Sequence, residues 1–485
     1  MSATKGNSPE KEAINVLSKS LALKVLNAAL ATGGDYAEIY VEQTERSSTL
    51  LENGRVEGVS GTLSYGAGVR ILKGFSSVYG YASDLSQKSL LSLAEKLSAS
   101  FEGERIITVK SLKKQRVKKI NPIKDSVMDV PPEEKIAYLK ECYEAVHEVD
   151  PTKLARIQNS LGSTRTKIEI FNAEGEEGKI LEDLEERTRV GFIAFAVGEN
   201  NAIETAFKGP GRCAGWSYFK NELDYKTKGR EVGEKAIMML GAKECPSGRF
   251  PVVIGNGWGG VLFHEACGHP LESSATAKGL SVFSNSIGKQ IASTIVSAYD
   301  DGTIENEWGS SNIDSEGVPT SKVELIKDGI CTGFLVDRSN GRRLNMPPTG
   351  CCRRQSYKND PTSRMSNTYI ESGKDDPEQI IKDTKLGIYV VDFGGGSVEP
   401  TTGEFNFSAS EAYIIRDGKV CEPVKGCTLI GTGQEILMNI DRVGNDRALG
   451  QGMCGASSGS IPVNVGQPTI RLTEITVGGR GGKLE

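Results

Sequence analysis

The sequence predicts an α+β protein in which one or more N-terminal α/β domains precede a β-rich C-terminal domain. Helix-like and strand-like segments alternate up to about residue 240, whereas short β-like segments separated by glycine-rich turns dominate after residue 290. The length of 485 residues also exceeds the roughly 250–300 residues that a single core supports. Hydrophobic residues make up 38% of the chain and charged residues 25%, which is typical of a globular protein.

The first domain is predicted to cover residues 36–100. Apolar residues at helical spacing over 10–31 predict a helix that ends at Gly33-Gly34. Strand-like runs follow at 37–41, 48–52, 66–72 and 76–82, and Lys73-Gly74 forms a plausible turn between the last two. An amphipathic helix over 85–98 then completes an α-β-β-β-β-α block.

A second domain is predicted over residues 127–240. A basic run at 110–119 and the pair Asn121-Pro122 mark the boundary before it. Pro131 and Pro132 begin a helix over 133–147, because proline fits the first helical turn. Strand-like runs at 155–160, 167–172 and 188–197 and a helix over 228–240 complete this unit.

The third domain is predicted to cover residues 245–478 and begins at the turn Cys245-Pro246-Ser247-Gly248. Its β-like segments lie at 322–327, 331–337, 387–393, 412–416 and 470–477, with glycine-rich turns between them. One buried helix is expected near 258–269. This half is therefore β-rich, with a single helix of interest.

Charge and composition exclude several classes of function. The net charge of −5 argues against non-specific nucleic-acid binding, and the basic run at 110–119 is interpreted as a solvated linker or surface strand. No apolar run approaches the roughly 18 residues that span a bilayer, and the polar N-terminus has no secretory signal. Ten scattered cysteines are not a disulfide framework. We expect a cytoplasmic protein without nucleic-acid or membrane partners.

One glycine pattern resembles a nucleotide-binding loop but lacks the rest of that site. Gly255, Gly257 and Gly260 fit G-x-G-x-x-G after a predicted strand. A dinucleotide site also needs an acidic residue about 20 positions further on, and residues 276–299 contain neither Asp nor Glu. We therefore do not expect a nucleotide here.

The pattern His264-Glu265-x-x-x-His269 predicts a metal site. Histidines five positions apart lie about 140° apart on a regular α-helix, so chelation requires a π-type bulge or a break in the last turn. Gly268 and Pro270 favour such a break, and Glu265 would then face the remaining metal positions as a base. Two buried, hydrogen-bonded histidines are the alternative. His147, the remaining histidine, is expected to cap a helix.

A catalytic zinc site needs three protein ligands and an open position. No third usable histidine exists, so the remaining ligand must be Cys, Asp or Glu. Among the cysteines, Cys267 lies between the histidines, Cys351 and Cys352 precede two arginines, and Cys454 lies in a glycine-rich loop. Composition does not choose between them.

Several separated segments make the chain resemble the TldD/PmbA family of metallopeptidases, on its TldD side. Besides the two-histidine motif, they are Asp300-Asp301-Gly302-Thr303-Ile304, Arg353-Arg354-Gln355-Ser356-Tyr357, Arg364-Met365-Ser366-Asn367-Thr368, Phe393-Gly394-Gly395-Gly396, Gly444-Asn445-Asp446, Gly452-Met453-Cys454-Gly455 and Val465-Gly466-Gln467-Pro468. The resemblance is specific over about residues 250–470 and looser from 36 to 240. Cys267 and the Cys351-Cys352 pair are unusual positions for cysteine in this pattern.

This resemblance implies that zinc is held by His264, His269 and Cys454, with Glu265 as the catalytic base. It implies hydrolysis of small or unfolded peptides, including leader peptides. It also implies a homodimer, or a heterodimer with a PmbA-like (TldE-like) subunit. We expect Arg353, Arg354 and Arg364 to hold a substrate carboxylate or an oxyanion, with surface ion pairs as the alternative.

Two other classes of function compete with the enzyme. One is a non-catalytic peptide-binding or regulatory subunit with a structural zinc, which would normally be closed by four protein ligands. The other is a modulator of DNA topology, which the charge balance does not support.

Overall fold

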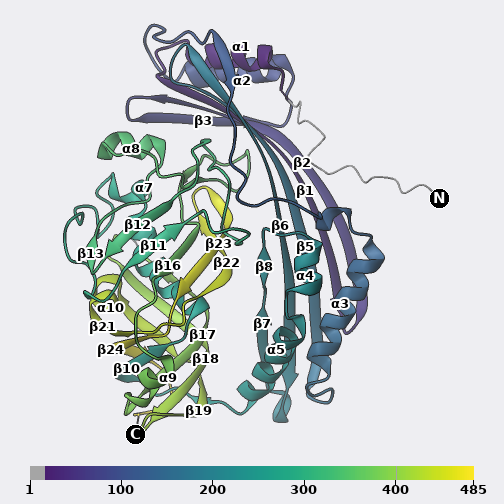
Figure 1. Cartoon of the computed structure of the whole chain (residues 1–485), viewed down its shortest axis with the longest axis vertical. Coiled ribbons are helices and arrows are strands. Elements are labelled where there is room, and N and C mark those ends of the chain that lie inside the picture. Colours follow the sequence, from purple (N-terminus) through teal and green to yellow (C-terminus); the bar gives the residue numbers. More distant parts are fainter. Residues whose placement is uncertain (1–16, 400, 485) are drawn as a thin grey trace.

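The computed structural model describes residues 17–399 and 401–484. The N-terminal half is built on one long, curved sheet with the strand order β3-β2-β1-β5-β6-β4, and β7 and β8 also pair with β6. Figure 1 shows this sheet arching past the C-terminal half, with helices at both of its ends. The strands are β1 (Tyr36–Glu52), β2 (Arg55–Lys73), β3 (Ser76–Ala82), β4 (Ser111–Lys114), β5 (Leu154–Ala173), β6 (Glu177–Val197), β7 (Ile203–Lys208) and β8 (Gly211–Arg212).

Helices cover the outer face of this sheet and form two separate cores. The helices are α1 (Lys19–Ala29), α2 (Gln87–Ser98), α3 (Pro132–His147), α4 (Trp216–Asn221) and α5 (Tyr225–Leu240). Ser18 and Ser86 cap α1 and α2 by accepting backbone N–H bonds, and both helices pack on the first strands. The proline start of α3 is as predicted, and α3 and α5 share the second core. Residues 10–16 of the first predicted helix lie outside the described residues.

Two pairs of predicted strands are single strands in the structure. The runs 37–41 and 48–52 both belong to β1, and 155–160 and 167–172 both belong to β5. The polar stretch between the runs obscured this continuity. The polar residues of β1 each have a partner residue on both sides, because β1 lies between β2 and β5 over almost its whole length. As a result, strands from the predicted units 36–100 and 127–240 pair in one sheet.

The basic run at 110–119 is a surface strand only over Ser111–Lys114, and residues 115–119 have no regular secondary structure. Lys110, Lys113 and Lys114 pair with Glu176, Glu177 and Glu182 along the edge of β6. These exposed ion pairs contribute little to stability, but they neutralise the basic charge locally.

The C-terminal half contains two larger sheets and a small one. The first has the order β17-β10-β24-β20-β18-β19-β9, and β17 also pairs with β18, which closes part of it into a ring. Its strands are β9 (Lys243–Glu244), β10 (Gly248–Ile254), β17 (Leu386–Val398), β18 (Glu404–Arg416), β19 (Lys419–Lys425), β20 (Thr428–Thr432), β21 (Ile440–Val443) and β24 (Ile470–Gly478). The core of this half fills that ring and the space beside it.

The second sheet has the order β13-β12-β11-β16-β23-β22, so β22 forms an edge. Its strands are β11 (Ala298–Asp301), β12 (Lys322–Lys327), β13 (Ile330–Cys331), β16 (Asn367–Ile370), β22 (Ala448–Ala456) and β23 (Gly459–Gln467); β14 (Cys352–Arg353) and β15 (Thr362–Ser363) form the small sheet. The helices are short: α6 (Val261–Phe263), α7 (Ser273–Thr276), α8 (Arg338–Leu344), α9 (Pro377–Lys382) and α10 (Gly433–Asn439). The α+β prediction with a β-rich second half is confirmed.

The predicted strand at 331–337 is wrong beyond its first residue. Only Cys331 belongs to a strand, after which the chain turns away from β12. Leu335 then exchanges backbone hydrogen bonds with Leu271 and Ser273. The apolar residues of this segment are buried because they pack behind the two-histidine motif, which the sequence pattern did not distinguish from a strand.

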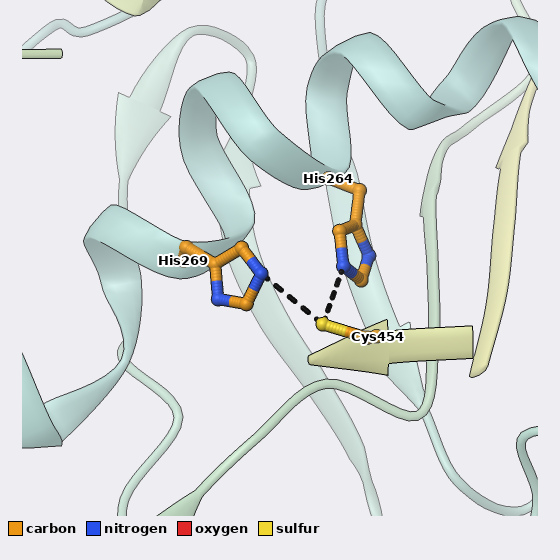
Figure 2. A group of neighbouring side chains, drawn as sticks. All are labelled: His264, His269 and Cys454. Atoms are coloured by element: carbon orange, nitrogen blue, oxygen red, sulfur yellow. Dashed lines mark hydrogen bonds between the residues drawn. The ribbon is translucent and has the colours of Figure 1, made fainter. Parts of the chain in front are cut away.

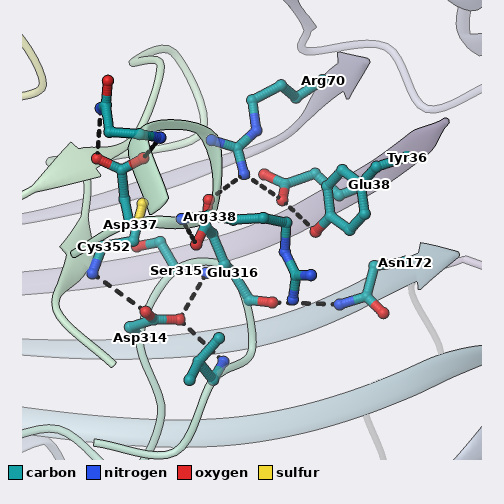
Figure 3. A network of polar contacts seen from close by, with 12 residues as sticks. Tyr36, Glu38, Arg70, Asn172, Asp314, Ser315, Glu316, Asp337, Arg338 and Cys352 are labelled. Atoms are coloured by element: carbon teal, nitrogen blue, oxygen red, sulfur yellow. Dashed lines mark hydrogen bonds and ion pairs between the residues drawn. The ribbon is translucent and has the colours of Figure 1, made fainter. Parts of the chain in front are cut away.

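A buried ion network joins the two halves of the molecule. Arg70 on β2 donates to Glu38 on β1 at 2.9 Å and to Glu316 of the C-terminal half at 2.5 Å. Arg354 donates to the other oxygen of Glu38 at 2.6 Å. Figure 3 shows Arg70 between the two glutamates, with Asn172 donating to the backbone carbonyl of Glu316. This network, the interhalf clamp (Glu38, Arg70, Glu316 and Arg354), fixes the sheet against the C-terminal half.

Among the described residues, none of the helices has the length and apolar character needed to cross a membrane.

Candidate metal centre

The segment that carries the two histidines begins directly after β10 and packs closely on β23. A Cβ at Gly260 would lie 2.4 Å from the backbone of Gly466, and Gly257 has a φ of +66°. The glycines of the G-x-G-x-x-G pattern therefore allow a helix start to contact a strand. This packing explains the pattern without a nucleotide.

The two histidines are brought together by a π-helical turn at His264–Gly268, between α6 and a 3₁₀ turn at His269–Leu271. The predicted π-type bulge is thus confirmed. Gly268 is required there, because a Cβ would lie 2.0 Å from the sulfur of Met365. The imidazole rings have centroids 5.0 Å apart, and both direct a nitrogen to the same point (Figure 2).

Cys454 reaches this point from the edge strand β22. Its Sγ lies 3.2 Å from Nε2 of His264 and 3.1 Å from Nε2 of His269. Ligand atoms of these three residues all lie within 4.8 Å of one another. The structure therefore unites the three residues that the family resemblance had selected, across about 190 positions of sequence.

Two glutamates adjoin His269. Oε2 of Glu265 lies 3.7 Å from Nε2 of His269, on the same side as the sulfur. Oε1 of Glu272 lies 3.1 Å from Nδ1 of His269 and is buried. A carboxylate on the far nitrogen of a ligating histidine fixes its tautomer and orientation and raises its basicity.

The environment favours the thiolate form of Cys454. Burial alone would raise its pKa, but His264 and His269 lower the pKa of this thiol to about 3. Burial lowers the pKa of His269, whereas Glu272 and Cys454 raise it well above its usual value. A thiolate is the form of cysteine that binds metal.

The donor set fits a zinc ion. Zn–S and Zn–N bonds of about 2.3 and 2.0–2.1 Å at a tetrahedral angle place sulfur and nitrogen about 3.5 Å apart. The observed separations of 3.1 and 3.2 Å need only a small outward shift. Nδ1 of His264 is buried without a hydrogen-bond partner among the described residues. The polar contact of this ring is therefore made by Nε2, which faces the sulfur of Cys454.

The three arginines singled out in the sequence are buried, so none forms a surface ion pair. Arg364 is 0% exposed and donates to the carbonyls of Cys454 and Gly459 at 2.6 and 2.9 Å. Arg354 belongs to the interhalf clamp. Arg353 donates to the carbonyl of Met365 at 2.7 Å. Their role in substrate binding stays a prediction.

The remaining candidates of the sequence lie elsewhere. Cys267, Cys351 and Cys352 are buried, with pKa values raised mainly by burial, and none of them shares the cluster of ligand atoms. His147 is the last residue of α3 and stacks on Tyr143, which agrees with its predicted place at a helix end.

Sequence reasoning missed one residue of the site, Glu272, and one contact of a residue that it had named, Arg364. Glu272 follows His269 by three positions, and a carboxylate so close to a candidate ligand was a usable signal. The contact of Arg364 with the backbone of Cys454 had no signal in the sequence, because it joins segments 90 positions apart.

Three family models match the chain in order. They are the PmbA/TldA metallopeptidase domain 1 at residues 37–101, the central domain at 126–240 and the C-terminal domain at 247–479. Together they cover most of the sequence.

Curated relatives match over almost their full length. "Metalloprotease TldD homolog" proteins of Buchnera aphidicola and Haemophilus influenzae are each 37% identical over 459 residues, covering 92% of this chain and 93% of theirs. A "Metalloprotease" of Methanothermobacter thermautotrophicus is 31% identical and covers 92% of this chain and 96% of its own.

Solved structures share the fold at low identity. A putative modulator of DNA gyrase from Bacteroides thetaiotaomicron has a TM-score of 0.75 and 19% identity, covering 95% of this chain and 99% of its own. TldE from Thermococcus kodakarensis has a TM-score of 0.74 and 17% identity, covering 95% and 100%. At such identities the likeness concerns the fold alone.

Proposed function

Because this chain belongs to the PmbA/TldD family of metallopeptidases, we propose that it is a zinc-dependent peptidase that hydrolyses small or unfolded peptides. The observation that carries the proposal is the position of the Cys454 sulfur, 3.1 and 3.2 Å from the facing nitrogens of two histidines. His264, His269 and Cys454 are the proposed ligands, and Glu265 is the proposed catalytic base.

The chemistry divides between the metal and the side chains around it. Zinc, when bound, supplies a Lewis acid that polarises a carbonyl and lowers the pKa of water to about 7. The carboxylate of Glu265 takes the proton of the attacking water and returns it to the leaving amine nitrogen. The carboxylate of Glu272 accepts a hydrogen bond from the proton on Nδ1 of His269, which leaves Nε2 unprotonated and free to bind the metal. As a ligand, the thiolate of Cys454 would neutralise part of the charge of the metal.

The edge position of β22 supports an extended substrate. This strand carries Cys454 and pairs with β23 alone among the described strands. An extended peptide can add to such an edge through main-chain hydrogen bonds, which gives little side-chain specificity. We therefore include unfolded peptides, leader peptides among them, in the proposed substrate class.

A non-catalytic subunit with a structural zinc is the second candidate. A structural site would be closed by four protein ligands, whereas the described residues supply a cluster of three. For assembly, we propose a dimer, either of two copies or with a TldE-like subunit; the fold shared with a TldE protein is in keeping with the latter. A cytoplasmic location stays a prediction.

The variant Glu265→Gln tests the proposal. We expect peptide cleavage to fall by about 10²–10⁴-fold, because the proton acceptor is lost, while the zinc content stays near one ion per chain. Cleavage assays and metal analysis measure the two quantities. Glu305→Gln is the matched control and should keep full activity, since Glu305 is exposed in the same half.

Metal removal provides the complementary test. A chelator should abolish cleavage, and added zinc should restore it in the wild type but not in Cys454→Ser. Unchanged turnover by Glu265→Gln, or cleavage that resists chelation, would contradict the enzyme and favour the non-catalytic subunit.

A further inference from the structure

A cavity of about 610 Å³ lies between the long sheet and the C-terminal half. One wall is the inner face of β1, β5 and β6, and the other includes Trp308, Arg353 and the hairpin of β22 and β23. None of the proposed zinc ligands, nor Glu265, lines it. The proposed chemistry therefore leaves the cavity without a role.

The cavity is positive in a protein whose net charge is −5. Five arginines line it, against the acidic side chains of Glu42, Glu185 and Asp314. Burial and the neighbouring Glu316 raise the pKa of Asp314, which weakens its negative charge at neutral pH. Walls of low dielectric constant concentrate the field of such a cluster within the cavity.

Three of these arginines have no ion-pair partner within 4 Å among residues 17–399 and 401–484. Arg187 and Arg354 are paired, with Glu185 and Glu38 respectively. Arg46, Arg189 and Arg353 have no such carboxylate partner. The hydrogen bonds of Arg189 and Arg353 go to backbone carbonyls.

Arg353 is the most unusual of the three unpaired arginines. It is 8% exposed, and one of its nitrogens donates to the carbonyl of Met365. Burial and the nearby charge of Arg187 lower the pKa of Arg353 to about 10, so it remains protonated at neutral pH. Glu185 and Asp300 act on the charge of Arg353, but neither forms an ion pair with it. A buried charge without a close counter-ion is costly, which is why buried charges are normally paired. A bound anion would supply the missing partner.

The cavity adjoins the metal centre through the β22–β23 hairpin. Two neighbours of Cys454 line the cavity: Met453, which precedes it in β22, and Ile461, which lies opposite Cys454 on β23. An extended peptide advances about 3.3 Å per residue, so a peptide passing this hairpin reaches from the metal centre into the cavity within a few residues.

We propose that this cavity is an exosite that binds a carboxylate group of the peptide substrate, with Arg46 and Arg353 as its principal anchors and Arg189 beside them. The proposal rests on the proposed peptidase function. The carboxylate belongs either to the C-terminus of the peptide or to an acidic side chain near the scissile bond. Binding energy from such a remote contact positions the reacting peptide bond.

The test measures binding and cleavage separately, with three acetylated alanine-rich peptides of equal length. The first ends in a free carboxylate, the second is amidated and neutral, and the third is amidated and carries two glutamates. Titration calorimetry on zinc-loaded Glu265→Gln protein gives the dissociation constants without hydrolysis. We expect the first or third peptide, or both, to bind about tenfold more tightly than the second, since charge-assisted bonds are the strong ones.

Variants then identify the anchors. Arg46→Gln, placed in the same background, should abolish most of the preference for carboxylate, and high salt should weaken it. Arg353→Gln should act likewise, provided that its melting temperature shows a folded protein. Arg55→Gln is the matched control, because Arg55 is exposed on the same sheet and does not line the cavity; its preference should equal that of the parent.

The outcomes separate this proposal from the peptidase function. Equal binding of all three peptides, or a preference that survives in both folded arginine variants, overturns the exosite even if the enzyme cleaves peptides. Arginine-dependent binding of carboxylate peptides supports the exosite, and if no peptide is then cleaved by the wild type, only the proposed catalysis fails. A preference confined to the first or to the third peptide identifies the source of the carboxylate.

Discussion

Arg364 holds the backbone of the cysteine that faces the two histidines. Its guanidinium donates to the carbonyl of Cys454, to the hydroxyl of Ser458 and to the carbonyl of Gly459. The hairpin end would otherwise leave buried carbonyls without donors. The thiolate is therefore placed by a side chain from a different segment.

The conservative substitution Arg364→Lys should loosen this placement. An ammonium group cannot reproduce the fork of donors, so one or more buried acceptors lose their partner at about 1–3 kcal/mol. We expect zinc affinity to fall by about 10–100-fold, which competition with a chromophoric chelator measures. Arg55→Lys, at an exposed position, is the control. Wild-type affinity in Arg364→Lys would show that the hairpin is held without it.

A second residue gives the protein a predictable pH dependence. Glu169 is 4% exposed and lies opposite Glu182 on the neighbouring strand. Burial, with a contribution from Glu182, raises the pKa of Glu169 to about 7, against about 4.3 for an unfolded glutamate. Folding therefore takes up a proton in this range, and this residue makes stability fall as pH rises from about 4.3 to 7.

Glu169→Gln should remove the loss of folding stability that the buried carboxylate causes at higher pH. We expect the variant to be more stable than the wild type by about 1–2 kcal/mol at pH 8, with the difference shrinking toward pH 5. Urea denaturation at both pH values measures it. Glu177→Gln changes the same charge in an exposed pair on β6 and should have a small effect independent of pH. A wild type as stable as the variant at pH 8 would contradict the raised pKa.

Only part of the candidate site could be read from residues alone. The five-residue spacing of His264 and His269, with Gly268 and Pro270, led to a π-type turn because helical geometry is local. Cys454 was selected through the family resemblance, since no local rule connects positions separated by 190 residues. The arginines of the cavity were visible as residue types, but their burial and unequal pairing depend on the tertiary structure.

At the scale of elements, the π-helical turn depends on a close contact with α10. A Cβ on Gly433, the first residue of α10, would lie 2.1 Å from the backbone oxygen of Ala266, in the middle of that turn. Two backbones that meet this closely leave no flexible side chain to move aside. The turn and the helix must therefore shift together if either gains volume.

Gly433→Ala tests this contact. We expect a loss of about 1–3 kcal/mol from overpacking and a weaker zinc affinity, because the turn carries His264 and His269. Thermal unfolding and the chelator competition report the two effects. Gly58→Ala is the matched control, as nothing lies within 4 Å of a Cβ there. An unchanged melting temperature and metal affinity in Gly433→Ala would refute the close contact.

Element types were predicted better than element lengths. The helices α2, α3 and α5 lie near their predicted places, because their patterns are amphipathic and their starts carry proline or capping residues. The strand β12 also lies at its predicted place. The long strands were divided in the prediction. Their central residues are polar on both faces and owe their strand conformation to neighbours on both sides, which is a tertiary effect.

At the scale of the whole molecule, the interhalf clamp makes the position of the sheet depend on buried charges. Arg70 is 1% exposed and neutralises Glu316, which has no other ion pair within 4 Å among the described residues. Removing one partner of a buried pair leaves an uncompensated charge. The contact between Arg70 and Glu316 joins residues that are 246 positions apart in the sequence. Its loss therefore tests how strongly the two halves hold each other.

Arg70→Met should destabilise the protein by about 3–5 kcal/mol. Denaturant unfolding measures this loss, and a biphasic curve would show that the halves no longer unfold together. Arg156→Met removes an exposed pair with Glu52 and should cost less than about 1 kcal/mol. Equal losses in the two variants would argue against the clamp.

The separation of the three proposed ligands along the chain also determines when the centre can form during synthesis. His264 and His269 leave the ribosome long before Cys454, and β22 has a pairing partner only after residues 459–467 have followed. A nascent or prematurely terminated chain thus has the two imidazoles and the glutamate without the thiolate. A chain that stops before Cys454 would therefore lack the thiolate that completes the proposed centre.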